Sequence, residues 1–191
     1  MSTELLDRRQ VVRELVAERG DMLVIGGLGG TTWDLADGGE HPLDFGTWGA
    51  MGNAAMLGLG LALAQPARPV LVITGDGEML MGLGALATIA VQAPANLTVA
   101  VIDNELYGET GRQPTHTGLG VDLAGIARAA GIADSETITE PARVTALKAR
   151  LTEPGPRFAA IKVAKENGAM VLPERDGVVI KSRFRKALLG D

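Results

Sequence analysis

Short apolar runs alternate along the chain with longer segments whose apolar residues recur at helical spacing. Residues 70–74 and 97–102 are almost continuously apolar, as expected for strands that are covered on both faces. Between them, residues 78–92 place Leu80, Leu83, Leu86 and Val91 on one face, which predicts a helix. Repeated strand–helix alternation predicts one α/β domain, residues 1–191, with a doubly wound, mostly parallel sheet and helices on both faces.

The other expected elements follow from the same patterns. Helices are expected at 5–20, 51–64, 121–130, 141–151 and 179–189, and strands at 21–25, 43–47, 136–139 and 158–164. Residues 33–42 are polar and are expected to be irregular. The loop 105–120 is long for a compact domain, and loops of this length are often functional.

Composition narrows the classes of function. Lys and Arg number 18 against 23 Asp and Glu, and no basic stripe is present, which argues against a nucleic-acid partner. The absence of cysteine excludes disulfides, thiolate nucleophiles and cysteine metal sites. The apolar run 51–64 is too short to span a bilayer, and the N-terminus lacks an apolar signal core. A cytoplasmic protein that makes no membrane contact is therefore expected.

Two polar residues stand at the ends of neighbouring predicted strands. Asp76 follows the strand 70–74, and Asn104 follows the next strand 28 positions later. Carboxyl ends of parallel strands meet at one sheet edge, where open α/β folds bind ligands. A carboxylate and an amide oxygen beside exposed backbone amides suit Mg²⁺ carrying a phosphorylated ligand. Ordinary turn chemistry is the alternative, and a one-residue register shift would make Asp103 the ligand in place of Asn104.

Two further features remain ambiguous from the residues alone. The glycine-rich stretch 26–32 follows a predicted strand and is a candidate phosphate loop, but Thr32 stands where the third glycine of a dinucleotide fingerprint would fall. A plain strand-end turn is the favoured interpretation. Met51 is followed by a helix of small residues, and spacing alone favours an ordinary core methionine.

These motifs together resemble the diphosphate-binding domain of thiamine-diphosphate-dependent enzymes. The similarity covers roughly residues 21–189 and is most specific at 49–52 (Gly-Ala-Met-Gly), 75–78 (Gly-Asp-Gly-Glu), 103–104 and 108–115. The last block looks most like the branch that holds the small subunit of sulfopyruvate decarboxylase and the C-terminal half of phosphonopyruvate decarboxylase.

The resemblance implies roles for individual residues. Mg²⁺ would be bound by Asp76, by the side chain of Asn104 and by the backbone carbonyl of Leu106. Met51 would be the apolar wedge that keeps thiamine diphosphate bent, because it lies 25 positions before Asp76. The implied cofactor-binding residues are Gly49, Met51, Gly75, Asp76, Gly77, Glu78, Asn104, Leu106, Tyr107 and Gly108. Among these, Gly77 and Glu78 would offer backbone N–H groups to the diphosphate, and the Gly49 carbonyl would accept from the cofactor's amino group.

Candidate catalytic residues come from the loop 105–120. Relatives place an acid near this point, so Glu109 is the candidate carboxylate over the reacting carbon, and a solvated loop glutamate is the alternative. His116 is the second candidate, although isolated loop histidines are usually solvated. Arg112 would suit an anionic substrate group or would simply lie at the surface.

The resemblance implies one subunit of a split enzyme. The chain would be the diphosphate-binding subunit of a thiamine-diphosphate- and Mg²⁺-dependent 2-oxo acid decarboxylase, a carbon–carbon lyase. The glutamate that acts on the aminopyrimidine ring would come from a separate pyrimidine-binding subunit, in an α2β2 or larger heteromer, because 191 residues have room for one such domain. Alternatives are a carboligase of the acetolactate-synthase type, a non-catalytic subunit that keeps the fold, and a nucleotide-binding module. The sequence does not indicate which 2-oxo acid is used.

Overall fold

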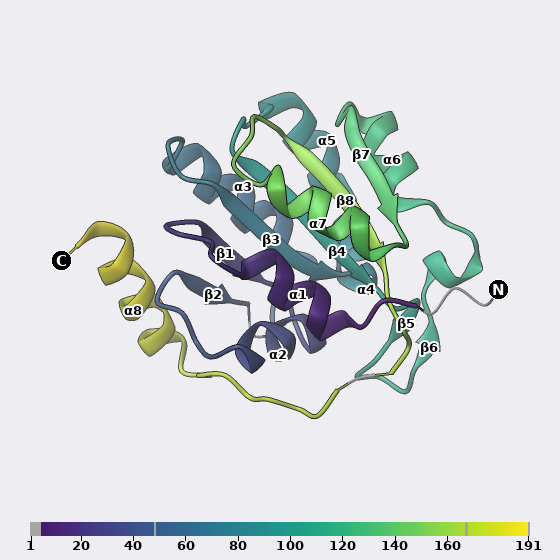
Figure 1. Cartoon of the computed structure of the whole chain (residues 1–191), viewed down its shortest axis with the longest axis horizontal. Helices are drawn as coiled ribbons and strands as arrows, with labels where there is room; N and C mark the ends of the chain where they lie inside the picture. Colours follow the sequence, from purple (N-terminus) through teal and green to yellow (C-terminus); the bar gives the residue numbers. More distant parts are fainter. Residues whose placement is uncertain (1–4, 48, 167, 191) are drawn as a thin grey trace.

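A six-stranded sheet, whose neighbouring strands all run parallel, forms the centre of the molecule (Figure 1). The computed structural model describes residues 5–47, 49–166 and 168–190, so Trp48, next to the 49–52 motif, lies outside the described residues. The sheet order is β2-β1-β3-β4-β8-β7. The strands are β1 Leu23–Gly26, β2 Asp44–Gly46, β3 Val70–Gly75, β4 Leu97–Asp103, β7 Asp134–Ile138 and β8 Arg157–Lys162. The predicted doubly wound parallel sheet is confirmed.

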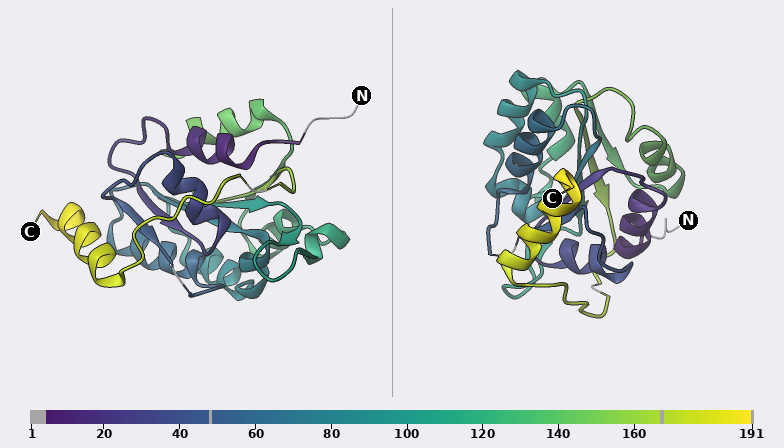
Figure 2. Two further views of the ribbon diagram at one scale, coloured as in Figure 1. Left: turned by 90° about the horizontal axis from the view of Figure 1, so that it is seen from below. Right: turned by 90° about the vertical axis from the view of Figure 1, so that its left-hand side faces the viewer.

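Helices cover both faces of this sheet (Figure 2). One layer holds α3 Ala54–Ala64, α4 Asp76–Met81, α5 Gly84–Gln92 and α6 Leu123–Ala130. The other holds α1 Arg8–Val16, α2 Gly30–Asp37 and α7 Pro141–Ala149. Each layer buries its own apolar cluster against the strands, since the strand side chains alternate between the two faces. In the described parts of the chain, no helix has the length and apolar character needed to cross a bilayer.

The C-terminal helix α8 Gly177–Leu189 lies at the β2 edge of the sheet. Phe184 of α8 meets Phe45 of β2 edge to face, with 5.5 Å between the ring centroids. The chain reaches this helix through an extended stretch that ends at Asp176 and follows the lower rim in Figure 1. The Asp176 side chain caps α8 by accepting from the N–H groups of Val178 and Val179.

Three sequence predictions are corrected. The single helix at 78–92 is wrong, because α4 ends at Met81 and α5 starts at Gly84. The Gly82 N–H closes α4 on Glu78 and Met79, and its Cα packs so near the Gly52 carbonyl that a Cβ would not fit. Residues 33–42 are not wholly irregular, because ion pairs from α1 hold α2 there.

The third correction concerns the loop 105–120. It folds into a small hairpin, β5 Leu106–Tyr107 with β6 Gln113–Pro114, followed by the 3-10 helix η1 His116–Leu119. Element ends also shift by a few residues, so that the strand expected at 136–139 is β7 Asp134–Ile138.

The strand order places a crevice between β1 and β3. From β1 the chain moves outward to β2, whereas from β3 it moves the opposite way to β4. Such a switch point opens a cleft at the carboxyl ends of the strands. The register pairs Gly26 with Ile73 and Gly75 with Ile102, so the segments after β1, β3 and β4 emerge next to one another.

Candidate functional site

A cavity of about 140 Å³ opens at this switch point. Its walls come from the glycine-rich turn after β1, the start of α4, the end of β4 and the β5 hairpin, with Arg8 of α1 on one side. Nine of the ten predicted cofactor-binding residues line it, namely Met51, Gly75, Asp76, Gly77, Glu78, Asn104, Leu106, Tyr107 and Gly108. Tertiary folding therefore brings together motifs that are separated by more than 50 positions in the sequence.

Asp76 is the first residue of α4 and is only 2% exposed. One carboxylate oxygen, Oδ2, accepts a hydrogen bond from the Thr115 hydroxyl and lies 3.1 Å from the Thr117 hydroxyl oxygen. Burial raises the pKa of Asp76 to about 6; the Thr115 hydrogen bond opposes this rise and the charge of Asp103 adds to it. A cation at this carboxylate would relieve the cost of burying its charge.

Asn104 and Asp103 point to different surroundings. Asn104 lines the cavity, and its Oδ1 accepts from the Leu106 N–H at 3.1 Å in a turn that also presents Leu106 to the cavity. Asp103 is absent from the lining, and its Oδ2 pairs with Lys162 Nζ at 2.9 Å. Asn104 therefore lines the cavity together with Asp76, whereas Asp103 does not.

The predicted metal ligands are one carboxylate, one amide and one backbone carbonyl. Across residues 5–47, 49–166 and 168–190, no three Asp, Glu or His side chains gather as a metal-binding group. Mg²⁺ at Asp76 and Asn104 would accordingly need oxygens from a bound ligand and water to complete its six positions.

The Glu78 side chain is a site feature that sequence reasoning missed. Its Oε2 accepts from the Leu28 N–H and from the Thr74 hydroxyl, both at 2.9 Å, and its Oε1 accepts from the Ala54 N–H at 3.4 Å. One buried carboxylate thus connects the ends of β1 and β3 with the start of α3. Gly27 leaves room for it, since a Cβ there would collide with Oε2. The acid directly after Gly75-Asp76-Gly77 was the only sequence signal.

The hairpin after β4 closes over the start of α4. The Thr115 N–H donates to the Glu105 carbonyl at 2.9 Å, which brings the Thr115 hydroxyl to Asp76. The Tyr107 ring lies against the Cα of Gly77, where any Cβ would collide with it. Glu109 lines the cavity on the Gly29 side. Thr115 and Thr117 were not singled out from the sequence, because hydroxyls in a polar loop carry no distinctive spacing.

Arg8 is a further residue that the sequence did not mark. It lies at the start of α1, is 7% exposed, and its guanidinium packs against Gly30 while its Nε donates to Asp34 Oδ2 at 2.5 Å. Burial raises the pKa of Asp34, and the charge of Arg8 works against that rise. No sequence signal marks Arg8, because it belongs to a helix that is charged throughout and far from the motifs.

Three predicted residues lie elsewhere. His116 is exposed at the start of η1 and does not line the cavity. Arg112 is exposed and donates to the Lys165 carbonyl at 3.0 Å. Gly49 also lies outside the lining, with a φ of 72° that favours glycine.

Comparison with known proteins agrees with this geometry. Residues 26–163 match the family model "Thiamine pyrophosphate enzyme, C-terminal TPP binding domain". The chain is 34% identical, over 97% of both chains, to "Sulfopyruvate decarboxylase subunit beta" of Methanothermobacter thermautotrophicus. It is 33% identical to the protein of the same name from Methanocaldococcus jannaschii, covering 95% of this chain and 96% of that one. A "Phosphonopyruvate decarboxylase" of Streptomyces hygroscopicus is 44% identical over 56% of this chain and 26% of its own.

Solved structures support the fold alone. A solved structure described as a "putative thiamin diphosphate-dependent enzyme isolated from Mycobacterium smegmatis" matches 86% of this chain with a TM-score of 0.71 and 24% identity. Benzoylformate decarboxylase from Polynucleobacter necessarius matches the same share with a TM-score of 0.71 and 18% identity. The chain spans only 32% and 34% of the length of these two proteins.

Proposed function

Because the chain belongs to the thiamine pyrophosphate enzymes, as their C-terminal TPP-binding domain, we propose that it is the diphosphate-binding subunit of a thiamine-diphosphate- and Mg²⁺-dependent 2-oxo acid decarboxylase. The resemblance drawn from the motifs is confirmed by that membership. The observation that carries the proposal is the cavity at the switch point, where Asp76, Asn104 and Met51 meet. The relatives that match nearly end to end are decarboxylase subunits.

The metal part of the proposal rests on Asp76. Its buried carboxylate has a raised pKa and a neighbouring amide oxygen from Asn104, which is the kind of environment that a divalent cation stabilises. The Leu106 carbonyl is the proposed third ligand from the protein. Mg²⁺ held here would link the protein to the diphosphate, whose charge alone would be repelled by Asp76.

The remaining walls suit the rest of the cofactor. The N–H groups of Gly77 and Glu78 lie in the first turn of α4, where the helix dipole favours an anion. Gly29, Gly30 and Thr31 at the start of α2 line the same cavity, which supports the phosphate interpretation of this loop. Met51 is the proposed apolar wedge, and bound thiamine diphosphate would supply the electron sink on which a 2-oxo acid loses CO₂.

Glu109 is the proposed catalytic carboxylate of this chain. Its position in the cavity allows it to hold or deliver a proton near the reacting carbon. The catalytic role of His116 and the role of the Gly49 carbonyl stay predictions, since both residues lie outside the lining of the cavity.

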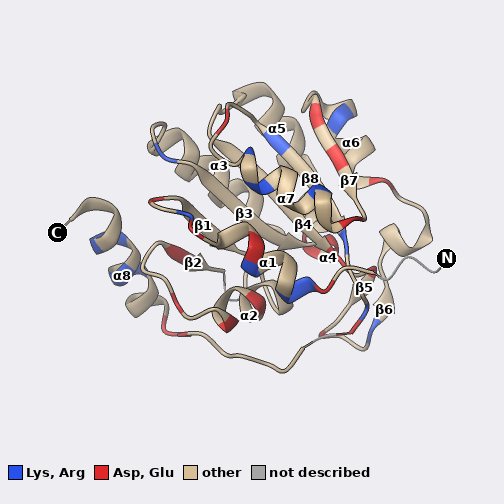
Figure 3. Ribbon diagram, viewed as in Figure 1, with Lys and Arg blue, Asp and Glu red and all other residues tan. Residues whose placement is uncertain are grey.

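A separate partner completes the proposed enzyme. The name "subunit beta" of the long-matching relatives implies another subunit in those enzymes. In this chain α3 carries no charged residue, as the tan ribbon in Figure 3 shows, yet Met56, Leu57 and Leu63 on it are exposed. A helix that is apolar all round belongs in an interface. We propose a pyrimidine-binding subunit as the partner, in an α2β2 or larger assembly located in the cytoplasm.

The test is reconstitution with the candidate partner encoded next to this chain. CO₂ release is measured with thiamine diphosphate, Mg²⁺ and a panel of 2-oxo acids, beginning with sulfopyruvate and phosphonopyruvate, because the relatives named above are decarboxylases of these two acids. We expect turnover that requires both chains, with the aldehyde as product. A hydroxyketone product would instead indicate a carboligase. Full activity of this chain alone would refute the split enzyme.

A further inference from the structure

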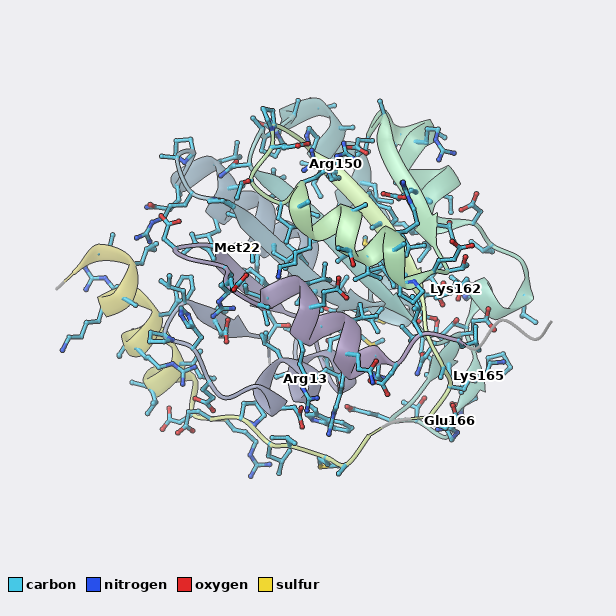
Figure 4. The ribbon with its side chains drawn as sticks, viewed as in Figure 1. Arg13, Met22, Arg150, Lys162, Lys165 and Glu166 are labelled. Atoms are coloured by element: carbon cyan, nitrogen blue, oxygen red, sulfur yellow. The ribbon has the colours of Figure 1, made fainter. Side chains whose placement is uncertain are left out.

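An ion pair joins the carboxyl ends of β4 and β8. Asp103 and Lys162 are direct partners in the parallel register, and Lys162 Nζ lies 2.9 Å from Asp103 Oδ2. Asp103 is 1% exposed, so its charge sits in a poorly solvated environment. Figure 4 shows Lys162 at the end of β8 that faces the β5 hairpin.

The other oxygen of Asp103 faces the candidate metal site. Asp103 Oδ1 accepts from the Thr117 hydroxyl at 2.7 Å and from the Glu105 N–H at 3.1 Å. The Thr117 hydroxyl is also 3.1 Å from Asp76 Oδ2. A hydroxyl has one proton and cannot donate to both carboxylates at once. A single side chain therefore separates two buried acids, only one of which lines the cavity.

Lys162 sets the net charge of the cluster that it forms with these two acids. With Lys162 present, Asp76, Asp103 and Lys162 sum to one negative charge, and without it they would sum to two. Glu105 also pairs with Lys162, at 3.0 Å, but it is partly exposed and shares a second pairing with Lys165 at 3.4 Å. Asp103 is buried and the Lys162 side chain is 23% exposed, so solvent screens both charges less than charges at the surface, and both act on a divalent cation bound at Asp76.

We propose that Asp103 and Lys162 are positioning residues that set the affinity of the Asp76–Asn104 site for Mg²⁺ without touching the ion. Asp103 raises the affinity through its charge, and Lys162 holds that charge in place and moderates it. The inference rests on the proposed Mg²⁺-dependent function and deepens it. The competing explanation is a purely structural pair that joins β4 to β8.

A double-mutant cycle separates the two explanations. Mg²⁺ is titrated at fixed thiamine diphosphate into the chain assembled with its partner, and binding is followed by calorimetry and by the fluorescence of Trp33, which lines the cavity. For Asp103→Asn we expect the Kd for Mg²⁺ to rise about tenfold, and for Lys162→Met to fall about threefold. Combining the two changes should leave the Kd about threefold above that of the wild type if the two charges act independently, and a departure from this value measures their coupling.

Two further measurements exclude a general loss of structure. Lys162→Arg keeps the positive charge and should leave the Kd within about twofold of the wild type. Thermal unfolding with and without Mg²⁺ should show a larger Mg²⁺-induced rise in Tm for Lys162→Met than for the wild type. If Asp103→Asn does not fold, Lys162→Met, Lys162→Gln and Lys162→Arg still compare loss with retention of charge.

The outcomes are distinct. A wild-type complex that shows no Mg²⁺-dependent cofactor binding overturns the proposed function, and this inference with it. A wild-type complex that binds Mg²⁺, with single variants that both weaken binding or both leave it unchanged, overturns this inference alone.

Discussion

Strand β8 carries a cation at each end, and the two ends differ in what lies beyond the ion pair. At the amino end, Arg157 pairs with Asp134 of β7 at 2.7 Å and donates to the carbonyls of Arg150, Glu153 and Pro154. At the carboxyl end, Lys162 pairs with Asp103, whose other contacts continue to Thr117 and Asp76. The first network closes on the backbone, whereas the second leads into the cavity.

An acid of the first network and an acid of the second, Asp134 and Asp76, have pKa values shifted in opposite directions. Burial by itself would raise the pKa of Asp134, but hydrogen bonds from Arg157 and Arg150 leave it below its usual value. Burial raises the pKa of Asp76 above its usual value. The same strand thus uses one ion pair to stabilise the fold and another beside a carboxylate whose charge is costly until a ligand arrives. Costly groups of this kind are typical of functional sites.

The largest expected effect comes from removing the Asp76 carboxylate in the network that leads into the cavity. Asp76→Ala should abolish Mg²⁺-dependent binding of thiamine diphosphate, because the proposed shell loses its only charged protein ligand. Calorimetry with the partner present measures this. Wild-type affinity in the variant would refute the metal assignment.

Glu109→Gln tests whether the cavity at the carboxyl ends of the strands takes part in catalysis as well as in binding the cofactor. We expect kcat to fall about 100-fold, because an amide of nearly the same shape cannot transfer a proton. The Kd of thiamine diphosphate should stay within about twofold, since Glu109 is not a proposed cofactor ligand. Steady-state kinetics and calorimetry on one preparation give both values. Unchanged kcat would make Glu109 an ordinary loop glutamate.

At the amino end of β8, Arg157→Leu should lower the stability of the fold without altering the cavity. The free energy of unfolding should fall by about 3 kcal/mol, because Asp134 loses one of its two arginine partners and three backbone carbonyls each lose a donor. Urea unfolding measures this, and the Mg²⁺ affinity of the folded variant should be unchanged.

Arg143→Leu is the matched control for this variant. Arg143 pairs with Glu136 at the surface, where its side chain is 55% exposed, so its loss should cost less than about 1 kcal/mol. An equal loss in the free energy of unfolding for the Arg143 and Arg157 variants would show that burial of the Arg157 ion pair adds nothing to stability.

The pH dependence of the stability of the ligand-free protein should also distinguish Asp76 from Asp134. Burial raises the pKa of Asp76 from its usual value of 3.8 to about 6 in the folded protein, so between these pH values the folded state holds a proton that the unfolded state has released. The contribution of Asp76 to the free energy of unfolding is fully present below pH 3.8. It falls as the pH rises to about 6, by about 3 kcal/mol at most.

Asp76→Asn should remove this loss when unfolding is followed against pH in metal-free buffer. The contribution of Asp134 has the opposite sign, because its lowered pKa makes it stabilising above its usual value and ineffective in acid. A wild-type profile that matches the Asp76→Asn profile would contradict the raised pKa.

The smallest effect is expected for His116→Ala. Because His116 is exposed at η1, outside the cavity lining, kcat/KM should change by less than about threefold. A loss of about 100-fold would instead support the catalytic role inferred from the sequence and would require η1 to move on substrate binding.

Local pattern predicted most of the fold because the buried strands are almost purely apolar and the helices between them are periodic. It failed where tertiary contacts override local preference. The break between α4 and α5 exists because Gly82 packs on the backbone of Gly52, which is 30 positions away. Helix α2 forms in a polar stretch because Asp34 and Asp37 meet arginines from α1. Neither contact is visible in a local window.

The sequence alone determined which residue types could form the site. The strand ends, the glycines around Asp76 and the spacing to Met51 and Asn104 can all be identified from the order of residues along the chain. Only the tertiary structure decided which neighbours act on them. It brought Arg8 from α1 to the cavity wall, directed Glu78 to the ends of three elements, and placed Lys162 against Asp103. The physical reason is that charge and burial act across space, and the sheet places these side chains within about 3 Å of partners that are far away along the chain.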